Sequence, residues 1–448
     1  MFVKGHLPGG EELREAILHT RLLGMSYVTT GGSAVTSRQQ GLGSRTPVRL
    51  TSMAVGGDAV GRLADGRAVF VTGALPGEVV VVRTTEDHGR YLRAVLEEVV
   101  EGSPDRVTAP CPFVAAGCGG CGWQHIRPEA QLRFKVSMAS DALERIAKVR
   151  GVVATAGGGL APTSYRTTVR VAVGKGAPSG GLAAQRARAG FRAARSHEVV
   201  LVDDCLVAHP WLSEMLAHGD FGSAREAVLR CGARTGDRMA VLAPRARGAR
   251  FGGGAVVVGT DELTRRRGGG VGVSISEEVA GTRLRLSPES FFQSGPEAAE
   301  LLVSAVTRAL ADSPPGPFVD AYAGVGLFAA TVGADRKVTM VESSQSAVAD
   351  ARWNVPGAEA VCTDVRRWAP VQAAVVVADP PRGGLGSEGA DVLTATGARS
   401  FVLVSCDAGS MGRDVGLLVE RGFRPQAVEV LDLFPGTPHL EIVALLVR

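Results

Sequence analysis

The fold of this chain is decided by the stretch FVDAYAGVGLF, residues 318–328. It begins as a short apolar strand, turns through Gly324 and Gly326, and continues into an apolar segment that can start a helix. The two glycines let the backbone turn tightly and approach a ligand at the carboxyl edge of a sheet. By itself the loop is a weak fingerprint, because Ala329 stands where a dinucleotide-binding motif has its third glycine.

Strands and helices alternate around this stretch, from Ser287 to the end of the chain. Such alternation predicts a parallel, doubly wound sheet, so the fold class is α/β. We place a Rossmann-like domain over residues 286–448 together with 126–156, whose helix is predicted over Pro128–Lys148. The predicted strands are Phe318–Tyr322, Val338–Glu342, Ala373–Asp379, Phe401–Cys406 and Val428–Leu433.

The amino-terminal half of the chain predicts two further domains. Residues 45–100 hold short β-like runs separated by glycine-containing turns, which predicts a small five-stranded barrel. Residues 101–125 and 157–285 read as a central mixed α/β domain, and residues 1–44 as a poorly structured extension that can hold one short helix, Glu11–Leu23. The β-like runs are Val48–Ser52, Ala68–Val71, Glu78–Thr84 and Leu92–Val99.

The composition is that of a globular protein, with 448 residues, 45% hydrophobic side chains and a formal net charge of +4. No apolar run approaches the ~18 residues of a membrane span, and Glu11, Glu12 and Glu15 stand where a signal peptide needs apolar residues. Seven unevenly spaced cysteines favour metal or catalytic roles in a reducing compartment over a disulfide framework. We expect a monomeric, cytoplasmic protein without a membrane partner.

Positive charge is concentrated in the central domain. The segment Tyr165–Arg195 contains seven basic residues and no Asp or Glu. Such a patch suits a nucleic-acid backbone, whereas a solvated arginine-rich face is the simpler alternative. Its basic members are Arg166, Arg170, Lys175, Arg186, Arg188, Arg192 and Arg195.

Acidic residues after successive strands indicate a nucleoside-binding site. Glu342 is placed to accept both ribose hydroxyls of an adenosine, and Asp364 to meet the adenine amino group. NAD and S-adenosylmethionine both satisfy this pattern. The turn Asp379-Pro380-Pro381 favours S-adenosylmethionine, because dehydrogenases do not need it and a cationic sulfonium without phosphates suits acidic surroundings.

Two residues near the carboxyl terminus indicate covalent chemistry on a pyrimidine. Cys406 ends an apolar run, and Glu441 ends the stretch FPGTPHLE, residues 434–441. A lone Cys usually fills core, and a lone Glu usually makes a surface ion pair. After strand ends, however, the two suit uracil, whose C5 becomes nucleophilic when a thiolate adds to C6 and whose C5 proton a carboxylate must then remove. The nucleobase must leave its stack to enter such a pocket, where His439 and Asp379 would be secondary acid–base groups.

These motifs resemble the RNA uracil-5-methyltransferases, which include the bacterial 23S rRNA and tRNA 5-methyluridine enzymes. The resemblance covers residues 45–448 and implies that the barrel is a TRAM domain, an RNA-binding module. It implies that Gln293 of the Phe-Phe-Gln motif, Tyr322, Glu342 and Asp379 bind the methyl donor. By the same resemblance, Cys406 would be the nucleophile and Glu441 the proton acceptor.

This chain departs from the family in the segment that carries the cysteine. The family reads Ser-Cys-Asn-Pro, whereas residues 405–408 here read Ser-Cys-Asp-Ala. The following Arg413 and Asp414 match the family pattern. The activity is therefore retained as the expectation, and the difference concerns the packing of the loop.

By the same resemblance, the central domain would be an iron–sulfur domain, with a [4Fe–4S] cluster held by Cys111, Cys118, Cys121 and Cys205. Zinc is the alternative, bound by the same four thiolates or by three of them with His125. The distant fourth cysteine is unlike the paired units of most zinc modules, which favours the cluster. Cys231 and Cys362 have no such neighbours and read as core.

The resulting prediction is an S-adenosylmethionine-dependent enzyme that methylates C5 of a uridine in structured RNA, with 23S rRNA favoured. A tRNA uridine is the alternative substrate, and a catalytically silent RNA-binding or assembly factor on the same fold is an alternative function. A DNA cytosine methyltransferase would carry Pro before its cysteine, where this chain has Ser405.

Overall fold

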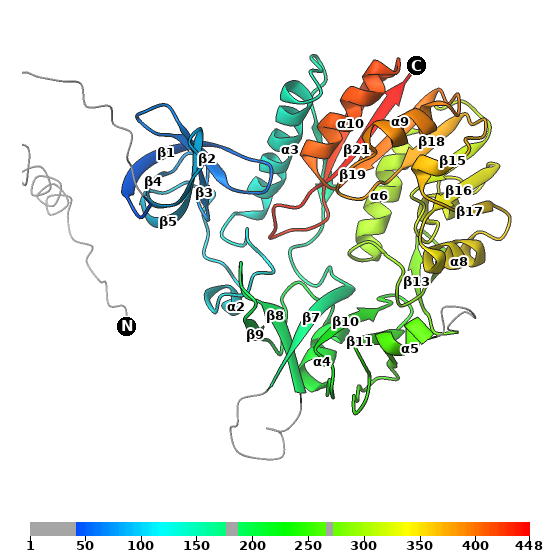
Figure 1. Cartoon of the computed structure of the whole chain (residues 1–448), viewed down its shortest axis with the longest axis horizontal. Helices are drawn as coiled ribbons and strands as arrows, with labels where there is room; N and C mark the ends of the chain where they lie inside the picture. Colours follow the sequence, from blue (N-terminus) through cyan, green and yellow to red (C-terminus); the bar gives the residue numbers. More distant parts are fainter. Residues whose placement is uncertain (1–41, 176–186, 266–271) are drawn as a thin grey trace, which may run out of the picture. The chain divides into compact units, whose positions relative to one another are not determined.

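The computed structural model describes residues 42–175, 187–265 and 272–448 (Figure 1). Residues 1–41 of the predicted extension, with the helix over Glu11–Leu23, lie outside the described residues, as does Arg186 of the basic segment. In the part of the chain that the structure describes, no helix is long and apolar enough to cross a membrane.

The predicted amino-terminal barrel is present and closed. Within the described residues its strands are ordered β1-β2-β3-β5-β4 around a core that includes Leu50, Val69, Val80 and Leu92. Alternate residues along each strand face this core, as the two-residue period of a strand requires. The sequence pattern does not reveal β2, because it is a four-residue strand. The bounds are β1 (Arg45–Met53), β2 (Ala59–Arg62), β3 (Ala68–Thr72), β4 (Val79–Asp87) and β5 (Tyr91–Glu101).

The central domain is built on a second, mainly antiparallel sheet, as its mixed pattern predicts. Among the described residues its strand order is β12-β11-β10-β7-β8-β9, and helix α4 (Pro210–His218) packs on β8 and β10. Leu212, Phe221 and Leu229 are fully buried in its core. The strands are β7 (Thr168–Lys175), β8 (Ala187–Arg192), β9 (Val199–Leu201), β10 (Glu226–Cys231), β11 (Arg238–Ala243) and β12 (Val256–Gly259), followed by α5 (Thr260–Arg265) and the hairpin of β13 (Ile275–Val279) and β14 (Thr282–Leu286).

The carboxyl-terminal domain holds the largest sheet of the described residues, in the order β17-β16-β15-β18-β19-β21-β20-β6. The strand order reverses between β15 and β18, which is where doubly wound sheets bind their ligands. All five predicted strands are present, together with three that the pattern did not identify. The bounds are β6 (Thr155–Gly159), β15 (Phe318–Ala321), β16 (Val338–Glu342), β17 (Glu359–Cys362), β18 (Val375–Ala378), β19 (Ser400–Ser405), β20 (Arg424–Asp432) and β21 (Glu441–Val447).

Strand β21 corrects the expectation of a purely parallel sheet, because it runs antiparallel to both neighbours, β19 and β20. Only a short loop, residues 433–440, joins β20 to β21, and a connection of that length can return the chain antiparallel but cannot make a crossover to a parallel strand. The consequence is that β21 starts at the edge where β19 ends.

Helices cover both faces of this sheet (Figure 1). Phe401 and Leu403 of β19 belong to one apolar cluster, which includes residues of α3, α9 and α10, whereas Val402 and Val404 belong to the cluster on the other face, with α6 and α7. The helices are α2 (Pro112–Ala115), α3 (Pro128–Arg145), α6 (Pro296–Ala309), α7 (Leu327–Ala330), α8 (Gln345–Asn354), the 3-10 turn η2 (Val365–Arg367), α9 (Gly386–Thr394) and α10 (Ala408–Glu420).

Candidate active site

A cavity of about 770 Å³ lies at the carboxyl edge of the large sheet. Parallel strands end at the same edge, so the residues that follow β15, β16, β18 and β19 meet there. All eight residues predicted to bind the methyl donor or to react line this cavity. They are Gln293, Tyr322, Gly324, Glu342, Asp364, Asp379, Cys406 and Glu441.

Cys406 and Glu441 are brought together by the pairing of β19 with β21. Ser405, the last residue of β19, stands opposite Ile442 in the antiparallel ladder. Cys406 therefore leaves β19 beside Glu441, the first residue of β21. The Glu441 side chain is almost fully buried, whereas Cys406 is only partly buried and faces the cavity.

The surroundings of Cys406 oppose its ionisation. Burial raises the pKa of the Cys406 thiol to about 11, and the nearby carboxyl groups of Glu441 and Asp379 contribute in the same direction. Burial also raises the pKa of Asp379 to about 7. The pKa of Glu441 is raised well above its ordinary value by burial and by Asp379. Two buried carboxyl groups that repel each other retain a proton near neutral pH, so the site stores both a thiol proton and a carboxyl proton.

The unusual segment after Cys406 still starts a regular helix. The Asp407 carboxylate accepts a hydrogen bond from the Ser410 amide at 2.8 Å and caps α10. Asp and Asn are equally good residues for this role, so the replacement of Asn keeps the cap. Asp414 of the same helix accepts hydrogen bonds from the amides of Leu385 and Gly386, which fixes the loop that follows β18.

The loop that follows β15 is held in an unusual backbone conformation. Tyr322, Gly324 and Gly326 have φ angles of 60°, 56° and 84°. A side chain on Gly326 would approach the Met340 sulfur at 3.1 Å, whereas no described atom lies within 4 Å of the corresponding position on Gly324. Gly324 is therefore required for its backbone angle, and Gly326 for both its angle and its close packing.

The two acidic residues predicted to contact adenosine already have partners. The Glu342 carboxylate accepts hydrogen bonds from the Gly324 amide at 3.0 Å and the Ser344 amide at 2.7 Å, so it positions the loop as well as facing the cavity. The Asp364 carboxylate caps η2 and binds the guanidinium of Arg366. Arg366 lowers the pKa of Asp364 to about 2. A ligand that binds Asp364 must share it with this arginine.

His439 is a neutral hydrogen-bonding group. Its Nδ1 lies 2.7 Å from Nη2 of Arg382. A guanidinium only donates, so Nδ1 accepts and the ring proton is on Nε2. Burial and the charges of Arg382, Arg166 and Lys135 lower the pKa of His439 to about 4. Near neutral pH the His439 ring is therefore uncharged. Its Nε2–H can donate a hydrogen bond, but the ring has no second proton to give to a substrate.

The cavity lining also includes residues to which the sequence analysis gave no role, among them Arg366, Arg382 and Phe434. Two of them carried a signal: Arg382 follows Asp379-Pro380-Pro381 directly, and Phe434 opens the stretch that ends in Glu441. Nothing in the sequence marked Arg366, because its role depends on its contact with Asp364.

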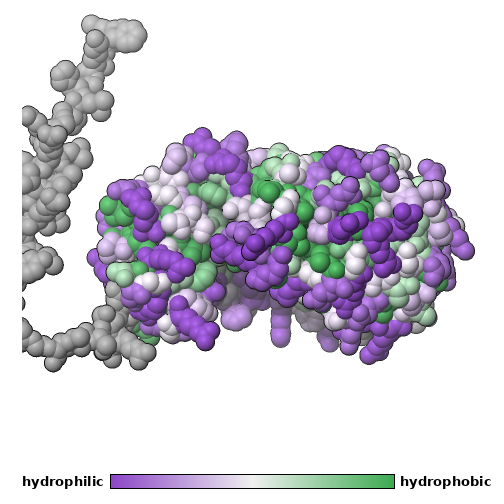
Figure 2. All heavy atoms as spheres, turned by 90° about the horizontal axis from the view of Figure 1, so that it is seen from above, coloured by the Kyte–Doolittle hydropathy of each residue, from purple (hydrophilic) through white to green (hydrophobic). Residues whose placement is uncertain are grey.

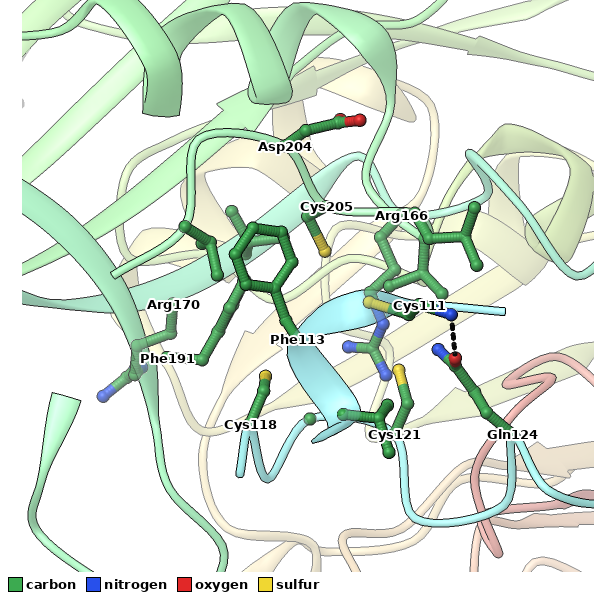
Figure 3. Close-up of a pocket in the computed structure, with 16 residues that line it drawn as sticks. Cys111, Phe113, Cys118, Cys121, Gln124, Arg166, Arg170, Phe191, Asp204 and Cys205 are labelled. Carbon is green, nitrogen blue, oxygen red and sulfur yellow. Dashed lines mark hydrogen bonds between the residues drawn. The ribbon is translucent and has the colours of Figure 1, made fainter. Parts of the chain in front are cut away.

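The four cysteines assigned to a metal centre line one cavity of about 220 Å³ in the central domain. Their sulfur atoms face a common space beside Phe113 (Figure 3). Burial raises the pKa of the Cys205 thiol to about 11 and also raises the pKa values of Cys118 and Cys121. A metal would therefore have to displace protons from these thiols.

The side chains do not form a site for a single metal ion. No three His, Cys, Asp or Glu side chains among the described residues are arranged to hold one. A tetrahedral zinc site needs sulfur atoms about 2.3 Å from one point, so this result supports neither the zinc alternative nor the cluster. His125 lines a different cavity, shared with Cys118 and Cys121, where its buried Nε2 has no hydrogen-bond partner among the described residues.

The two remaining cysteines differ from each other. Cys231 is buried, as predicted, but the prediction that Cys362 fills core is wrong, because its side chain is exposed. Cys362 ends β17, the edge strand of the sheet, where a side chain has a neighbouring strand on one side only.

The basic segment does not form one uniform face. Arg166 lies over the rings of Tyr165 and Phe434, and Arg170 lines the cysteine cavity. Arg192 pairs with Glu226 of β10, so folding brings an acidic residue to a segment that has none of its own. Arg195 donates a hydrogen bond to Thr72 of the barrel.

The face of the molecule seen in the space-filling view carries both hydrophilic and hydrophobic side chains (Figure 2). Hydrophilic side chains cover much of the visible face, with hydrophobic ones gathered in smaller groups between them. The electrostatic argument for RNA binding rests on local groups, because the formal net charge of the whole chain is only +4.

Comparison with known proteins finds a domain match and relatives that extend over most of the chain. Residues 39–96 match the TRAM domain. A Streptomyces avermitilis protein described as an uncharacterized RNA methyltransferase is 35% identical over 444 residues, covering 90% of this chain and 98% of that protein. A Caldanaerobacter subterraneus protein with the same description is 31% identical over 468 residues, covering 91% and 99%.

A solved structure shares the fold. The Pyrococcus abyssi tRNA (uracil-54, C5)-methyltransferase, in complex with S-adenosyl-L-homocysteine, has a TM-score of 0.65 and 24% identity. The alignment covers 90% of this chain and all of that one. Near-complete coverage of RNA methyltransferases above 30% identity, together with the TRAM domain, shows that the chain belongs to a family of RNA methyltransferases.

Proposed function

We propose that this protein uses S-adenosylmethionine to methylate C5 of a uridine in structured RNA. The observation that carries the proposal is the meeting of Cys406 and Glu441 at neighbouring strand ends, inside a cavity that also contains the predicted donor residues. The name of the Pyrococcus abyssi protein, a tRNA uracil C5-methyltransferase, agrees with this choice.

The reaction divides into an addition and an elimination. The Cys406 thiolate adds to C6 of uracil, and the electron pair of the C5–C6 double bond becomes available at C5. C5 takes the methyl group from the sulfonium, which leaves as S-adenosylhomocysteine. Glu441 then accepts the proton on C5, the double bond re-forms, and the C6–S bond breaks to return the Cys406 thiolate.

The protonation state of the site must change before this sequence can start. In the protein alone, the carboxyl groups near Cys406 disfavour its thiolate and retain a proton between them. A bound sulfonium adds a positive charge close to Asp379, which lowers the pKa of nearby acids. Donor binding thus favours an ionised Glu441 and a more acidic Cys406, so the catalytic groups become competent when the methyl donor is present.

The donor would lie along the carboxyl edge of the sheet. Glu342 would hold the ribose and Asp364 the adenine, while Gln293, Tyr322 and Asp379 would contact the methionine end. His439 is uncharged and its Nδ1 is bound by Arg382, so its Nε2–H would donate a hydrogen bond to a carbonyl oxygen of the uracil. It is less suited to act as a base.

For the cysteine cavity we propose a [4Fe–4S] cluster held by Cys111, Cys118, Cys121 and Cys205. The support for this proposal is that four thiols, the number of protein ligands that such a cluster takes, line one cavity of about 220 Å³, and that Cys205 lies far along the chain from the other three, unlike the paired cysteines of most zinc modules. The cluster would link distant parts of the chain through its four thiolate ligands. It would not take part in a redox step, because methyl transfer needs none.

Metal analysis tests this assignment separately. Protein purified without oxygen should contain about four iron atoms and four sulfides per chain. Cys205→Ala should lose them, whereas Cys362→Ser should retain them because Cys362 is remote from the cavity. Equimolar zinc with no iron in both the unaltered protein and Cys362→Ser would contradict the cluster.

As the substrate we favour 23S rRNA, because the chain combines a TRAM domain with the four cysteines. A tRNA uridine is the second candidate, favoured by the name of the solved structural relative. A catalytically silent RNA-binding or assembly factor is the alternative from another class.

Trapping with 5-fluorouridine-substituted rRNA and tRNA transcripts distinguishes these functions. Fluorine at C5 cannot be removed as a proton, so the enzyme should stall as a denaturation-resistant adduct at Cys406 when S-adenosylmethionine is present. An adduct with rRNA alone supports the favoured substrate, and one with tRNA alone replaces it. Absence of an adduct with either RNA, from protein that binds the methyl donor, would favour the silent factor.

A further inference from the structure

The loop between β20 and β21 is held in place by hydrogen-bond donors from widely separated parts of the chain. Four successive backbone carbonyls, from Leu433 to Gly436, each accept a hydrogen bond. The donors are Ser294 Oγ to Leu433 at 3.1 Å, Lys135 Nζ to Phe434 at 3.3 Å, Tyr165 OH to Pro435 at 3.0 Å, and the Trp123 amide to Gly436 at 2.8 Å. This loop carries Phe434 and His439 and leads directly into Glu441.

Gln131 of α3 completes the attachment at Gly436. Its Oε1 accepts a hydrogen bond from the Gly436 amide at 2.7 Å, and its Nε2 donates to the carbonyls of Ile126 at 2.9 Å and Trp123 at 3.3 Å. The Gln131 side chain is buried, so each of these bonds is protected from water. Gly436 thus has both its amide and its carbonyl bound by the segment from Trp123 to Gln131.

The same segment adjoins the cysteine cavity. Trp123 is two residues from Cys121, and Gln124 accepts a hydrogen bond from the Cys111 amide at 3.1 Å. Gly436 has a φ of 77°, and a side chain there would approach Gln124 at 3.3 Å and Cys121 at 3.9 Å. The loop of residues 433–440, which leads to Glu441 and which we call the catalytic loop, is therefore in direct contact with residues 111–126, which we call the cysteine-bearing segment.

We propose that Gln131 is a positioning residue for the elimination step. It ties the cysteine-bearing segment to Gly436, and through this loop it sets where Glu441 lies relative to the methylated carbon. The inference rests on the proposed function. It predicts that loss of the Gln131 contacts slows proton removal from C5 more than formation of the cysteine adduct, because Gln131 is hydrogen-bonded to the loop that leads into Glu441, whereas Cys406 directly follows β19.

The test compares two steps in one set of variants. Gln131→Met keeps the side-chain volume but removes its hydrogen bonds, and Gln131→Glu keeps an acceptor for the Gly436 amide. Thr396→Val is the matched control, because Thr396 is equally buried and hydrogen-bonded but lies away from the loop. Glu441→Gln shows what complete loss of the proton acceptor does.

The measurements are adduct formation with 5-fluorouridine RNA and release of 5-methyluridine from ordinary RNA. We expect Gln131→Met to trap fluorinated RNA at the unaltered rate but to release product roughly ten- to a hundredfold more slowly, the scale of a small misplacement. A covalent adduct should then accumulate on ordinary RNA, as with Glu441→Gln. Gln131→Glu should recover part of the release rate, and Thr396→Val should behave as the unaltered protein.

Other outcomes overturn the inference. Unaltered product release by Gln131→Met would show that the contact does not position Glu441. An equal loss of both steps in Gln131→Met, with donor binding also reduced, would show a merely structural role. If the unaltered protein itself forms neither adduct nor 5-methyluridine, the proposed function fails first, and the positioning role falls with it.

Discussion

Cys406, the proposed nucleophile, lies in surroundings that favour its protonated thiol. Burial and two carboxyl neighbours raise the pKa of Cys406, and the same burial raises those of Asp379 and Glu441. Such an arrangement limits reaction of the thiol with other electrophiles, because the thiolate is the reactive form. It also makes the reactivity of Cys406 depend on pH and on bound charge.

The first prediction concerns that dependence. Because the pKa of the Cys406 thiol is raised to about 11, alkylation of Cys406 by iodoacetamide should accelerate about tenfold per pH unit from pH 7 to 9.5. Peptide mass mapping separates Cys406 from the exposed Cys362, which serves as an internal reagent control. A rate for Cys406 that is already constant above pH 7 would show that the thiolate is stabilised instead.

The second prediction concerns Asp320, which is fully buried under the glycine loop. Burial, with smaller contributions from Asp379 and Glu342, raises the pKa of Asp320 to about 8. Since the folded protein holds this proton more tightly than the unfolded chain, the resulting stabilisation is complete below about pH 4 and is lost as the pH rises to 8. Asp320→Asn keeps a neutral side chain at every pH.

The stability difference between the unaltered protein and Asp320→Asn should therefore change with pH. The unaltered protein should lose up to about 1.4 kcal/mol per pH unit relative to the variant between pH 4 and 8. Urea unfolding of both proteins at several pH values measures this difference. The titratable groups that the two proteins share contribute equally to both free energies of unfolding, so their contributions cancel in the difference. A difference that stays constant over this range would contradict the assignment.

At the scale of elements, a buried ion pair joins α3 to β20. Lys135 Nζ lies 2.6 Å from Oδ1 of Asp432, and the Lys135 side chain is fully buried. Burial lowers the pKa of Lys135, and the neighbouring Asp432 opposes that shift. The pair lies directly before the catalytic loop, so it fixes where β20 ends.

The third prediction follows from this burial. Lys135→Met should lower the free energy of unfolding by about 3–5 kcal/mol, because it leaves the Asp432 charge buried without a partner. Lys135→Met combined with Asp432→Asn should lose less than the sum of the two single changes. Urea unfolding of the four proteins in this cycle provides the measurement, and strictly additive losses would show that the pair is not coupled.

At the scale of the whole molecule, the catalytic loop connects the domains. The Trp123 indole donates a hydrogen bond to the Gly57 carbonyl at 3.0 Å, and Gly57 of the barrel packs against Pro438. The barrel, the cysteine-bearing segment and the large sheet thus meet at one loop. RNA bound by a TRAM domain attached in this way would be held at a defined place relative to the cavity.

The fourth prediction uses two neighbouring glycines. Gly56 and Gly57 have φ angles of 99° and 94°, but a side chain at Gly57 would lie 2.5 Å from Pro438, whereas no described atom lies within 4 Å of one at Gly56. Both Gly56→Ala and Gly57→Ala should carry the backbone penalty of about 1–3 kcal/mol. Only Gly57→Ala should also reduce methylation of structured RNA, measured by methyl incorporation at saturating donor. Equal activity of the two variants would mean that the contact does not affect the loop.

How much the sequence predicted depended on whether the signal was local. Apolar runs and glycine turns identified the barrel and five strands of the large sheet, because these patterns reflect the period of each strand. Strand β2 was too short for such a signal, and β6 lies far from the rest of its sheet in the chain. Cys362 was misjudged because its exposure depends on β17 being the edge strand.

The sequence by itself determined the fold class and that the residues following β15, β16, β18 and β19 share one cavity, because residues that follow parallel strands meet at one edge whatever the details of packing. Only the tertiary structure decided that β21 runs antiparallel and starts beside Cys406, and that Gln131 contacts Gly436 across 305 residues of chain. It also decided that the Arg366 guanidinium donates a hydrogen bond to the Asp364 carboxylate, and that the Arg382 guanidinium donates one to Nδ1 of His439. Contacts of this kind arise from the packing of separate elements, which no local pattern records.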